Sequence, residues 1–156
     1  MAKIAVFPGS FDPITKGHES IIKRALPIFD QIIIAIGVNS NKNYLFSLEQ
    51  RKKWIKDTFN FEDKVSVDDY QGLTVQYCRS VGAGFILRGL RNAEDFQFEM
   101  GIAQMNRELA SEVDTVFFVT SPEYSAYSST IVRDIHRNGG DVSKFIPNAV
   151  QINEDF

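Results

Sequence analysis

Short apolar runs alternate along this chain with longer amphipathic stretches. The runs are rich in β-branched residues and almost continuously hydrophobic, as in IIIAIGV, and each has the length of one strand. They predict strands at residues 3–7, 32–38, 65–67, 85–87 and 115–119. Strands that are apolar on both faces are typical of a parallel sheet that is covered by helices on both sides.

The stretches between the runs carry apolar residues at helical spacing. They predict helices at residues 18–26, 48–59, 74–81, 93–109 and 129–137. The second helix opens with the capping-box pattern SLEQ, from Ser47 to Gln50, and the last is expected to stop at Gly139. This order favours an α/β fold with a doubly wound, five-stranded parallel sheet (Rossmann-like) and helices on both faces. Such sheets bind ligands beyond the carboxyl ends of their strands.

The composition excludes several classes of protein. A chain of 156 residues, 44% of them hydrophobic, is expected to form a single domain over residues 1–156. The net charge of -3 argues against nucleic acid as a partner. No apolar run approaches the roughly 20 residues of a membrane helix, and the start lacks a signal-peptide pattern, so a cytoplasmic protein with no membrane partner is expected. The acidic end NEDF is expected to be a solvated tail, and the single Cys78 a buried hydrophobe.

The segment FPGSFDPITKGHESIIKRA links the first predicted strand to the first predicted helix. Gly9 allows the chain to turn where a Cβ would be strained, and Pro13 stiffens the loop. Gly17 and His18 fall near the helix N-terminus, where free N–H groups and the helix dipole favour an anion. The spacing does not fit a Walker A loop, and GAGFIL, which begins at Gly82, does not complete the dinucleotide fingerprint. On this segment alone, a histidine in a first helical turn is more often a surface residue than a catalytic one, and His18 is expected to bury little apolar area.

A second segment, SPEYSAYSSTIVRDI, follows the last predicted strand. Three hydroxyl residues, Ser128 to Thr130, lie at the start of the last predicted helix, and one of them is expected to be its N-cap. Tyr124, Ser125 and Tyr127 precede them. Two helix N-termini at the same sheet edge predict a polyphosphate site.

These segments carry a family resemblance. GSFDPITKGH and YSSTIVR resemble the paired signatures of the nucleotidyltransferase superfamily, whose nucleotide fold is similar to that of class I aminoacyl-tRNA synthetases. FPGSFDPITKGH, RGLRNAEDFQFEMGIAQMNREL and SPEYSAYSST resemble the bacterial phosphopantetheine adenylyltransferases over essentially the whole chain. The resemblance implies transfer of an adenylyl group from ATP to 4′-phosphopantetheine, giving dephospho-coenzyme A and pyrophosphate in the penultimate step of coenzyme A synthesis. It also implies feedback inhibition by coenzyme A and a homo-oligomer, most simply a hexamer.

The resemblance implies roles for individual positions. The catalytic positions are His18, Lys42 and Arg88. The ATP-binding positions are Ser10, Phe11, His18, Gly89, Leu90, Arg91, Glu99, Tyr124, Ser125, Ala126, Tyr127, Ser128, Ser129 and Thr130. The acceptor-binding positions are Ser10, Lys42, Leu73, Thr74, Arg88 and Asn106. Ser10 stands where the family usually has threonine, and Thr74 where relatives can have methionine. Mg²⁺ is expected to arrive with ATP, without a permanent metal site on the protein.

The chemistry suits these residues, although alternatives stay open. Adenylyl transfer to a phosphate needs no protein nucleophile, so positioning and cations supply most of the catalysis. A related adenylyl- or cytidylyltransferase with another acceptor would differ at Lys42, Thr74 and Arg88. A non-catalytic adenine-nucleotide sensor could dispense with the acceptor cations. Arg91 could contact ATP or simply pair with Glu94 or Asp95.

The predicted helix at residues 93–109 is apolar on more than one face. A first stripe comprises Phe98, Ile102, Met105 and Leu109, and a second comprises Phe96, Met100 and Ala103. Apolar surface beyond one stripe predicts a partner helix, and the resemblance makes that partner an identical subunit. Elsewhere, Trp54 is expected to pack in the core and His136 to be solvated.

Overall fold

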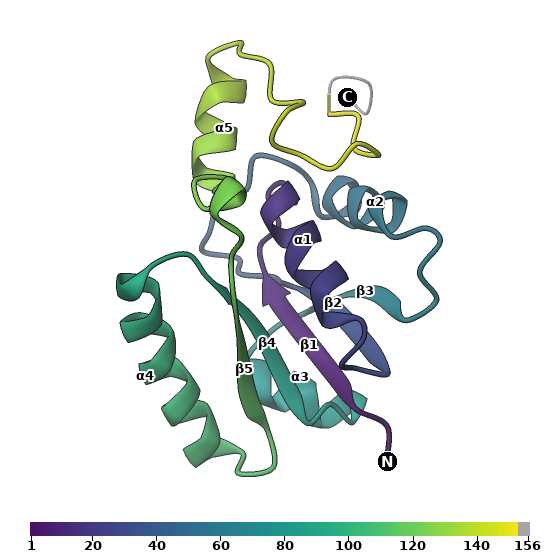
Figure 1. The fold of residues 1–156 in the computed structure, drawn as a ribbon, viewed down its shortest axis with the longest axis vertical. Coiled ribbons are helices and arrows are strands. Elements are labelled where there is room, and N and C mark those ends of the chain that lie inside the picture. Colours follow the sequence, from purple (N-terminus) through teal and green to yellow (C-terminus); the bar gives the residue numbers. More distant parts are fainter. Residues whose placement is uncertain (153–156) are drawn as a thin grey trace.

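The sheet is all-parallel and its strand order places the first strand at the centre. The computed structural model describes residues 1–152; residues 153–156, where the solvated tail is expected, lie outside the described residues. The strands are β1 (Ile4–Gly9), β2 (Gln31–Gly37), β3 (Val65–Tyr70), β4 (Phe85–Leu90) and β5 (Asp114–Val119), in the order β3-β2-β1-β4-β5 (Figure 1). The fold class and the five predicted strands are confirmed. Both β3 and β4 run three residues further than predicted, because polar residues at their ends still pair in the ladder.

The predicted helices are also confirmed. They are α1 (Lys16–Ala25), α2 (Leu48–Thr58), α3 (Thr74–Val81), α4 (Ala93–Leu109) and α5 (Ser129–Arg137), with a short 3-10 turn η1 (Pro122–Tyr124) before α5. The capping box of α2 forms as predicted: the Gln50 N–H donates to Ser47 Oγ over 3.2 Å, and the Ser47 N–H donates to Gln50 Oε1 over 3.0 Å. α5 ends at Arg137, and Gly139 follows with φ +80°.

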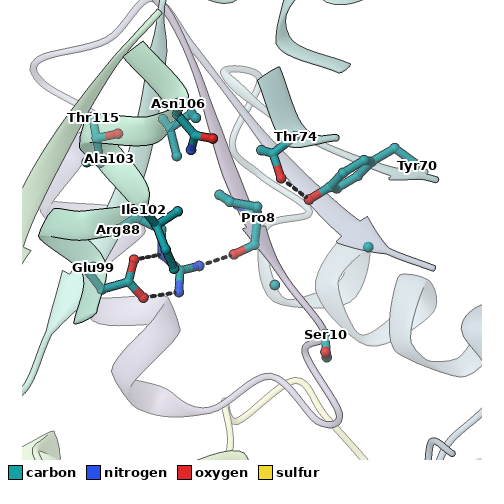
Figure 2. A pocket seen from close by; sticks show the side chains of 13 residues that line it. Pro8, Ser10, Tyr70, Thr74, Arg88, Glu99, Ile102, Ala103, Asn106 and Thr115 are labelled. Carbon is teal, nitrogen blue, oxygen red and sulfur yellow. Dashed lines mark hydrogen bonds and ion pairs between the residues drawn. The ribbon is translucent and has the colours of Figure 1, made fainter. Parts of the chain in front are cut away.

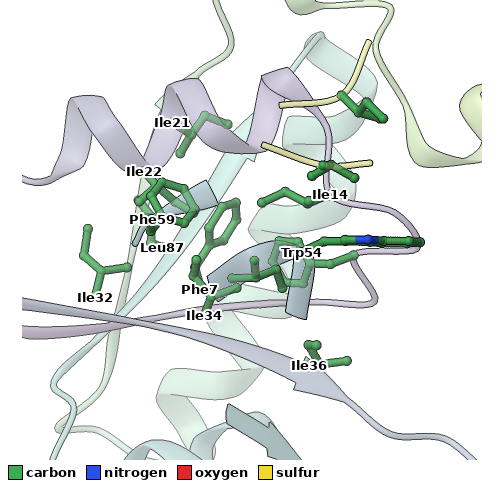
Figure 3. Packing of buried hydrophobic residues seen from close by; sticks show 14 of the residues in the cluster. Phe7, Ile14, Ile21, Ile22, Ile32, Ile34, Ile36, Trp54, Phe59 and Leu87 are labelled. Atoms are coloured by element: carbon green, nitrogen blue, oxygen red, sulfur yellow. The ribbon is translucent and has the colours of Figure 1, made fainter. Parts of the chain in front are cut away.

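Helices cover both faces of the sheet. On one face α1 and α2 pack on the larger core, which includes Ile22, Ile34 and Leu87 (Figures 1 and 3). Trp54 lies fully buried in this core, as predicted, with its ring centroid 4.8 Å from that of Phe46. His136 is partly buried, and its ring centroid lies 5.7 Å from the Phe46 ring, so the prediction of a solvated side chain is wrong.

The opposite face is covered by α3 and α4. A smaller core there contains Val6, Val75, Ile86 and Cys78, and Cys78 is fully buried as predicted. α4 packs against β4 and β5 on this face. Along residues 1–152 no helix has both the length and the apolar character needed to cross a membrane.

The strand order creates a switch point between β1 and β4. These neighbouring parallel strands lead into α1 and α4, which lie on opposite faces of the sheet. Their carboxyl ends therefore diverge and leave room for a ligand at that edge.

Candidate active site

Two pockets open at the switch point and share a wall. The α4 pocket, about 300 Å³, lies on the face of α3 and α4 and is lined by Tyr70, Thr74 and Asn106 among others (Figure 2). The α1 pocket, about 360 Å³, is lined by the starts of α1 and α5 and by Lys42. The residues that line both pockets are Pro8, Gly9, Ser10, Arg88 and Glu99. A group bound in one pocket can therefore meet a group bound in the other across Ser10 and Arg88.

His18 closes the N-terminus of α1. Its backbone N–H donates to Thr15 Oγ1 over 3.4 Å, and the Thr15 N–H donates to His18 Nδ1 over 3.0 Å. This is a capping box with histidine in the position usually taken by Glu or Gln. Because Nδ1 accepts a hydrogen bond, the ring hydrogen of neutral His18 belongs on Nε2.

The His18 ring also packs against aromatic side chains. Its centroid lies 4.9 Å from that of Phe11 and 6.1 Å from that of Phe7, and both phenylalanines are buried. The expectation that His18 buries little apolar area is therefore wrong. Gly9 is needed for the same packing: a Cβ there would lie 3.0 Å from the Phe11 ring, while its own φ is not in the left-handed region.

The charge state of His18 follows from its surroundings. Desolvation by burial, with the positive charges of Arg88 and Arg91, lowers the pKa of His18 to about 4. The ring is therefore neutral at pH 7 and retains an Nε2–H group, and His18 lines the α1 pocket.

Arg88 stands on β4 between the two pockets and is held from two sides. Its Nε and Nη2 donate to Glu99 Oε2 and Oε1 over 3.0 and 2.6 Å, and its Nη1 donates to the Pro8 carbonyl over 2.7 Å (Figure 2). Glu99 is buried. A guanidinium has five N–H donors, so two remain for a ligand after these three bonds. Arg88 is thus a fixed cation with a free edge.

Lys42 reaches the same junction from the β2–α2 connection. Its Nζ donates to Ser10 Oγ over 3.2 Å and lies 5.9 Å from the centroid of the Tyr44 ring. The serine hydroxyl accepts from the ammonium and keeps its own O–H for a ligand. Ser10 therefore supplies a hydroxyl group at this junction.

The three consecutive hydroxyl residues from Ser128 to Thr130 make different hydrogen bonds. Ser128 is the N-cap of α5, accepting the Ile131 N–H over 3.1 Å, as one of the three was expected to be. Ser129 Oγ donates to the Pro13 carbonyl over 2.8 Å and ties α5 to the loop before α1. Thr130 Oγ1 accepts from Arg133 Nη2 over 3.2 Å. All three hydroxyl residues line the α1 pocket, so two helix N-termini meet there.

The remaining predicted residues fall into three sets. Phe11, Gly89, Arg91, Tyr124 and Tyr127 line the α1 pocket, and Thr74 and Asn106 line the α4 pocket. Leu73, Leu90, Ser125 and Ala126 line neither. Arg91 donates from Nε to Asp95 Oδ2 over 3.1 Å, which is the pairing that the sequence left open.

Arg133 and Tyr70 are among the lining residues that sequence reasoning missed. Arg133 lines the α1 pocket, and its place one turn after Ser129 in YSSTIVR was the available signal. Tyr70 lines the α4 pocket and would have been found if β3 had been extended to its true end. Within residues 1–152, no three or more His, Cys, Asp or Glu side chains gather in a way that could hold a metal ion.

A family model, curated relatives and solved structures that match this chain are all nucleotidyltransferases by name. Residues 6–135 match the cytidylyltransferase-like family. The phosphopantetheine adenylyltransferases of Flavobacterium psychrophilum and Flavobacterium johnsoniae are 58% and 56% identical to this chain, each over 95% of it and 97% of the relative. A bifunctional NMN adenylyltransferase/ADP ribose pyrophosphatase from Francisella tularensis, complexed with AMP and a manganese ion, shares the fold with a TM-score of 0.68 at 22% identity; the match covers 94% of this chain and 44% of that one. This chain belongs to the phosphopantetheine adenylyltransferase family.

Proposed function

We propose that this protein transfers the adenylyl group of ATP to 4′-phosphopantetheine, giving dephospho-coenzyme A and pyrophosphate. Relatives at 58% and 56% identity carry the name of this activity. We place this reaction at the two adjoining pockets because Ser10 and Arg88 lie in the wall that they share. A reaction that joins two phosphate-bearing molecules requires two such compartments in contact.

We assign ATP to the α1 pocket. The N-termini of α1 and α5 supply backbone N–H groups and positive dipole ends for its phosphates. Arg91 and Arg133 add positive charge at the same pocket, and Tyr124 and Tyr127 offer aromatic surface to the adenine. ATP enters with its own Mg²⁺, whose preferred ligands are phosphate oxygens and water.

The acceptor is assigned to the α4 pocket. Its phosphate would lie at the junction, where Arg88 has two N–H donors left and Lys42 and Ser10 meet. Its pantetheine arm would extend between α3 and α4, past Thr74 and Asn106 (Figure 2). This pocket combines apolar walls with a few polar groups, which suits an arm of amides and methylenes.

The proposed reaction is an in-line displacement at the α-phosphorus of ATP. An oxygen of the acceptor phosphate forms a bond to that phosphorus, while the bond from phosphorus to the bridging oxygen breaks and pyrophosphate leaves with the electron pair. His18 would donate its Nε2 hydrogen bond to an α-phosphate oxygen as charge rearranges there. Lys42 would stabilise the same oxygens as a point charge, and no residue has to give up a proton.

We also propose a homo-oligomer, most simply a hexamer, with feedback inhibition by coenzyme A. The α4 side chains Phe98 and Met105 are 70% and 64% exposed in the single chain, which supports coverage by another subunit. Coenzyme A contains both a nucleotide and a pantetheine arm, so it could compete for both pockets at once.

The test is pyrophosphate release from MgATP with and without 4′-phosphopantetheine. Release should depend on that acceptor, and nicotinamide mononucleotide in its place should give none. Arg88→Lys should raise the KM for phosphopantetheine more than it weakens ATP binding, because lysine cannot both pair with Glu99 and hold a phosphate with two bonds. Faster turnover of another acceptor would replace the substrate assignment, and ATP binding without any transfer would indicate a sensor.

A further inference from the structure

The loop that carries Lys42 is attached to the loop that carries Ser10 by two buried charged residues. Residues 38–47 contain neither helix nor strand, so their place depends on contacts with neighbours. Asp12 and Arg51 supply these contacts and are 2% and 3% exposed. Neither residue lines the α1 or the α4 pocket, so neither is placed to touch a substrate.

Asp12 holds the loop from the side of β1. Its Oδ2 accepts the Leu45 N–H over 2.9 Å, and its Oδ1 accepts the Phe46 N–H over 3.0 Å. Bonds from backbone N–H groups to a carboxylate are charge-assisted and stronger than neutral ones. Since Asp12 follows Ser10 closely in the chain and Leu45 follows Lys42 closely, this contact fixes the two loops beside each other.

Arg51 holds the same loops from α2. Its Nε donates to the Phe46 carbonyl over 3.1 Å, and its Nη1 donates to the Ser10 carbonyl over 2.9 Å. Its guanidinium carbon lies 4.2 Å from the centroid of the Tyr44 ring. One planar side chain thus contacts both loops, which requires the fork and the flat face of arginine.

Burial of the Arg51 guanidinium costs free energy, because the charge is removed from water. Desolvation lowers the pKa of Arg51, although the charge of Asp12 acts in the opposite direction. Well-packed apolar residues in place of buried ionic groups are often at least as stable. A buried Arg51 with two carbonyl partners therefore indicates a requirement for geometry rather than for stability.

We infer that Arg51 and Asp12 are positioning residues, which clamp the Lys42 loop to Ser10 and hold Lys42 Nζ at the junction of the two pockets. The 3.2 Å contact between Lys42 Nζ and Ser10 Oγ is the product of this clamp. The inference rests on the proposed function, in which Lys42 acts on the reacting phosphates. Misplacement of a catalytic group by about 1 Å can cost roughly 10² in rate, so loosening the clamp should reduce turnover without removing any group from the site.

The test is a double-mutant cycle of Arg51→Met and Lys42→Met, read as steady-state pyrophosphate release. Lys42→Met should lower kcat by roughly 10², and Arg51→Met should lower it by about 10-fold with the KM for ATP almost unchanged. In the double variant, kcat should be no lower than in Lys42→Met alone, because the clamp acts through Lys42. If Arg51 has only a structural role, Arg51→Met should leave kcat unaltered, or the fold-losses in kcat from the two substitutions should multiply in the double variant.

Controls separate the clamp from general destabilisation. Ile55→Val alters a fully buried apolar residue one turn further along α2; it should lower the melting temperature and leave kcat per folded molecule unchanged. If Arg51→Met does not fold, Asp12→Asn replaces one of the two carboxylate acceptors and tests the same contact. Hydrogen exchange at the Leu45 and Phe46 amides should accelerate in each clamp variant that folds.

The outcomes of the cycle are distinct. If Lys42→Met retains normal kcat, the proposed catalytic site is wrong. If Lys42→Met is slow but Arg51→Met or Asp12→Asn turns over normally despite faster amide exchange, the positioning inference is overturned while the proposed function stands. Equal losses from Arg51→Met in the presence and in the absence of Lys42 would also overturn the inference.

Discussion

His18 uses its two ring nitrogens for different purposes. Nδ1 accepts the Thr15 N–H and completes the cap of α1, which leaves the Nε2 hydrogen for the phosphate contact that we propose. Position and chemistry are therefore linked: the bond that stabilises the helix also selects the tautomer. The sequence indicates only a histidine near a helix start; the capping box between Thr15 and His18 could not be predicted, because it depends on the orientation of the ring.

Variants of His18 can separate the cap from catalysis. His18→Ala should lower kcat by roughly 10² to 10³ and stability by about 1 kcal/mol through loss of the cap. His18→Gln restores a residue that suits the capping box, so it should regain most of the stability and little of the activity. Pyrophosphate release, urea unfolding and ATP binding on the three proteins measure these effects. Comparable turnover in the alanine variant and the wild type would contradict a catalytic role.

The lowered pKa of His18 predicts a pH dependence. Between about pH 6.5 and 4 the unfolded chain takes up a proton at this histidine while the folded protein does not, since the folded pKa is about 4. The contribution of neutral His18 to stability is therefore complete above pH 6.5 and lost progressively as the pH falls to 4. Urea unfolding at pH 7 and pH 5 should show this decline in the wild type, and a smaller one in His18→Gln. An NMR titration that placed the His18 pKa near 6.5 would refute it.

At the scale of elements, the sequence predicted the strands and helices well and their ends less well. Apolar runs and helical spacing identify the middle of each element. The ends of β3 and β4 were missed because Asp68, Asp69 and Arg88 are polar, although they pair with neighbouring strands. Arg88, and Tyr70 at the end of β3, line the pockets, so the polar residues that break the apolar pattern include residues of the candidate site.

The candidate site was likewise predicted in part: residues within local motifs were found, and residues whose role depends on tertiary packing were missed. His18 and Ser128 were found because each stands within a short local motif, GSFDPITKGH and YSSTIVR respectively. Arg51 was missed because its role arises from the packing of α2 against the Ser10 carbonyl, a contact between residues 41 positions apart. Buried charges in ordinary-looking helices give no periodic signal, so such positioning residues emerge only from the structure.

The packing of α1 on β4 yields a prediction at this scale. A Cβ at Gly89 would overlap the Cδ1 atom of Ile21, and Ile21 is buried. Gly89→Ala should therefore lower the free energy of unfolding by about 1–3 kcal/mol through overpacking. Adding Ile21→Val removes the methyl group that the new Cβ meets and should recover part of the loss. Chemical denaturation of the two variants would measure this, and a fully stable single variant would contradict the close approach.

At the scale of the whole molecule, apolar surface is concentrated on one helix. Within residues 1–152, Phe96, Phe98, Met100, Ile102, Met105 and Leu109 of α4 are all at least 39% exposed. Glu99 is the one buried residue of this helix, and it faces Arg88 at the pockets. α4 thus has one side at the site and a broad apolar side left for another molecule.

The exposed side of α4 predicts a closed homo-oligomer, because a contiguous apolar face on a long helix is typical of a subunit interface. Light scattering at micromolar concentration should give a multiple of the chain mass, with a hexamer as the expected state. Phe98→Glu together with Met105→Glu should reduce that mass, since charge is disfavoured in the core of an interface. The control is Phe61→Glu, which changes a phenylalanine that is 93% exposed outside α4 and should leave the mass unchanged. A wild-type protein that scatters as a monomer would refute the assembly, and an equal effect of Phe61→Glu would place the interface elsewhere than α4.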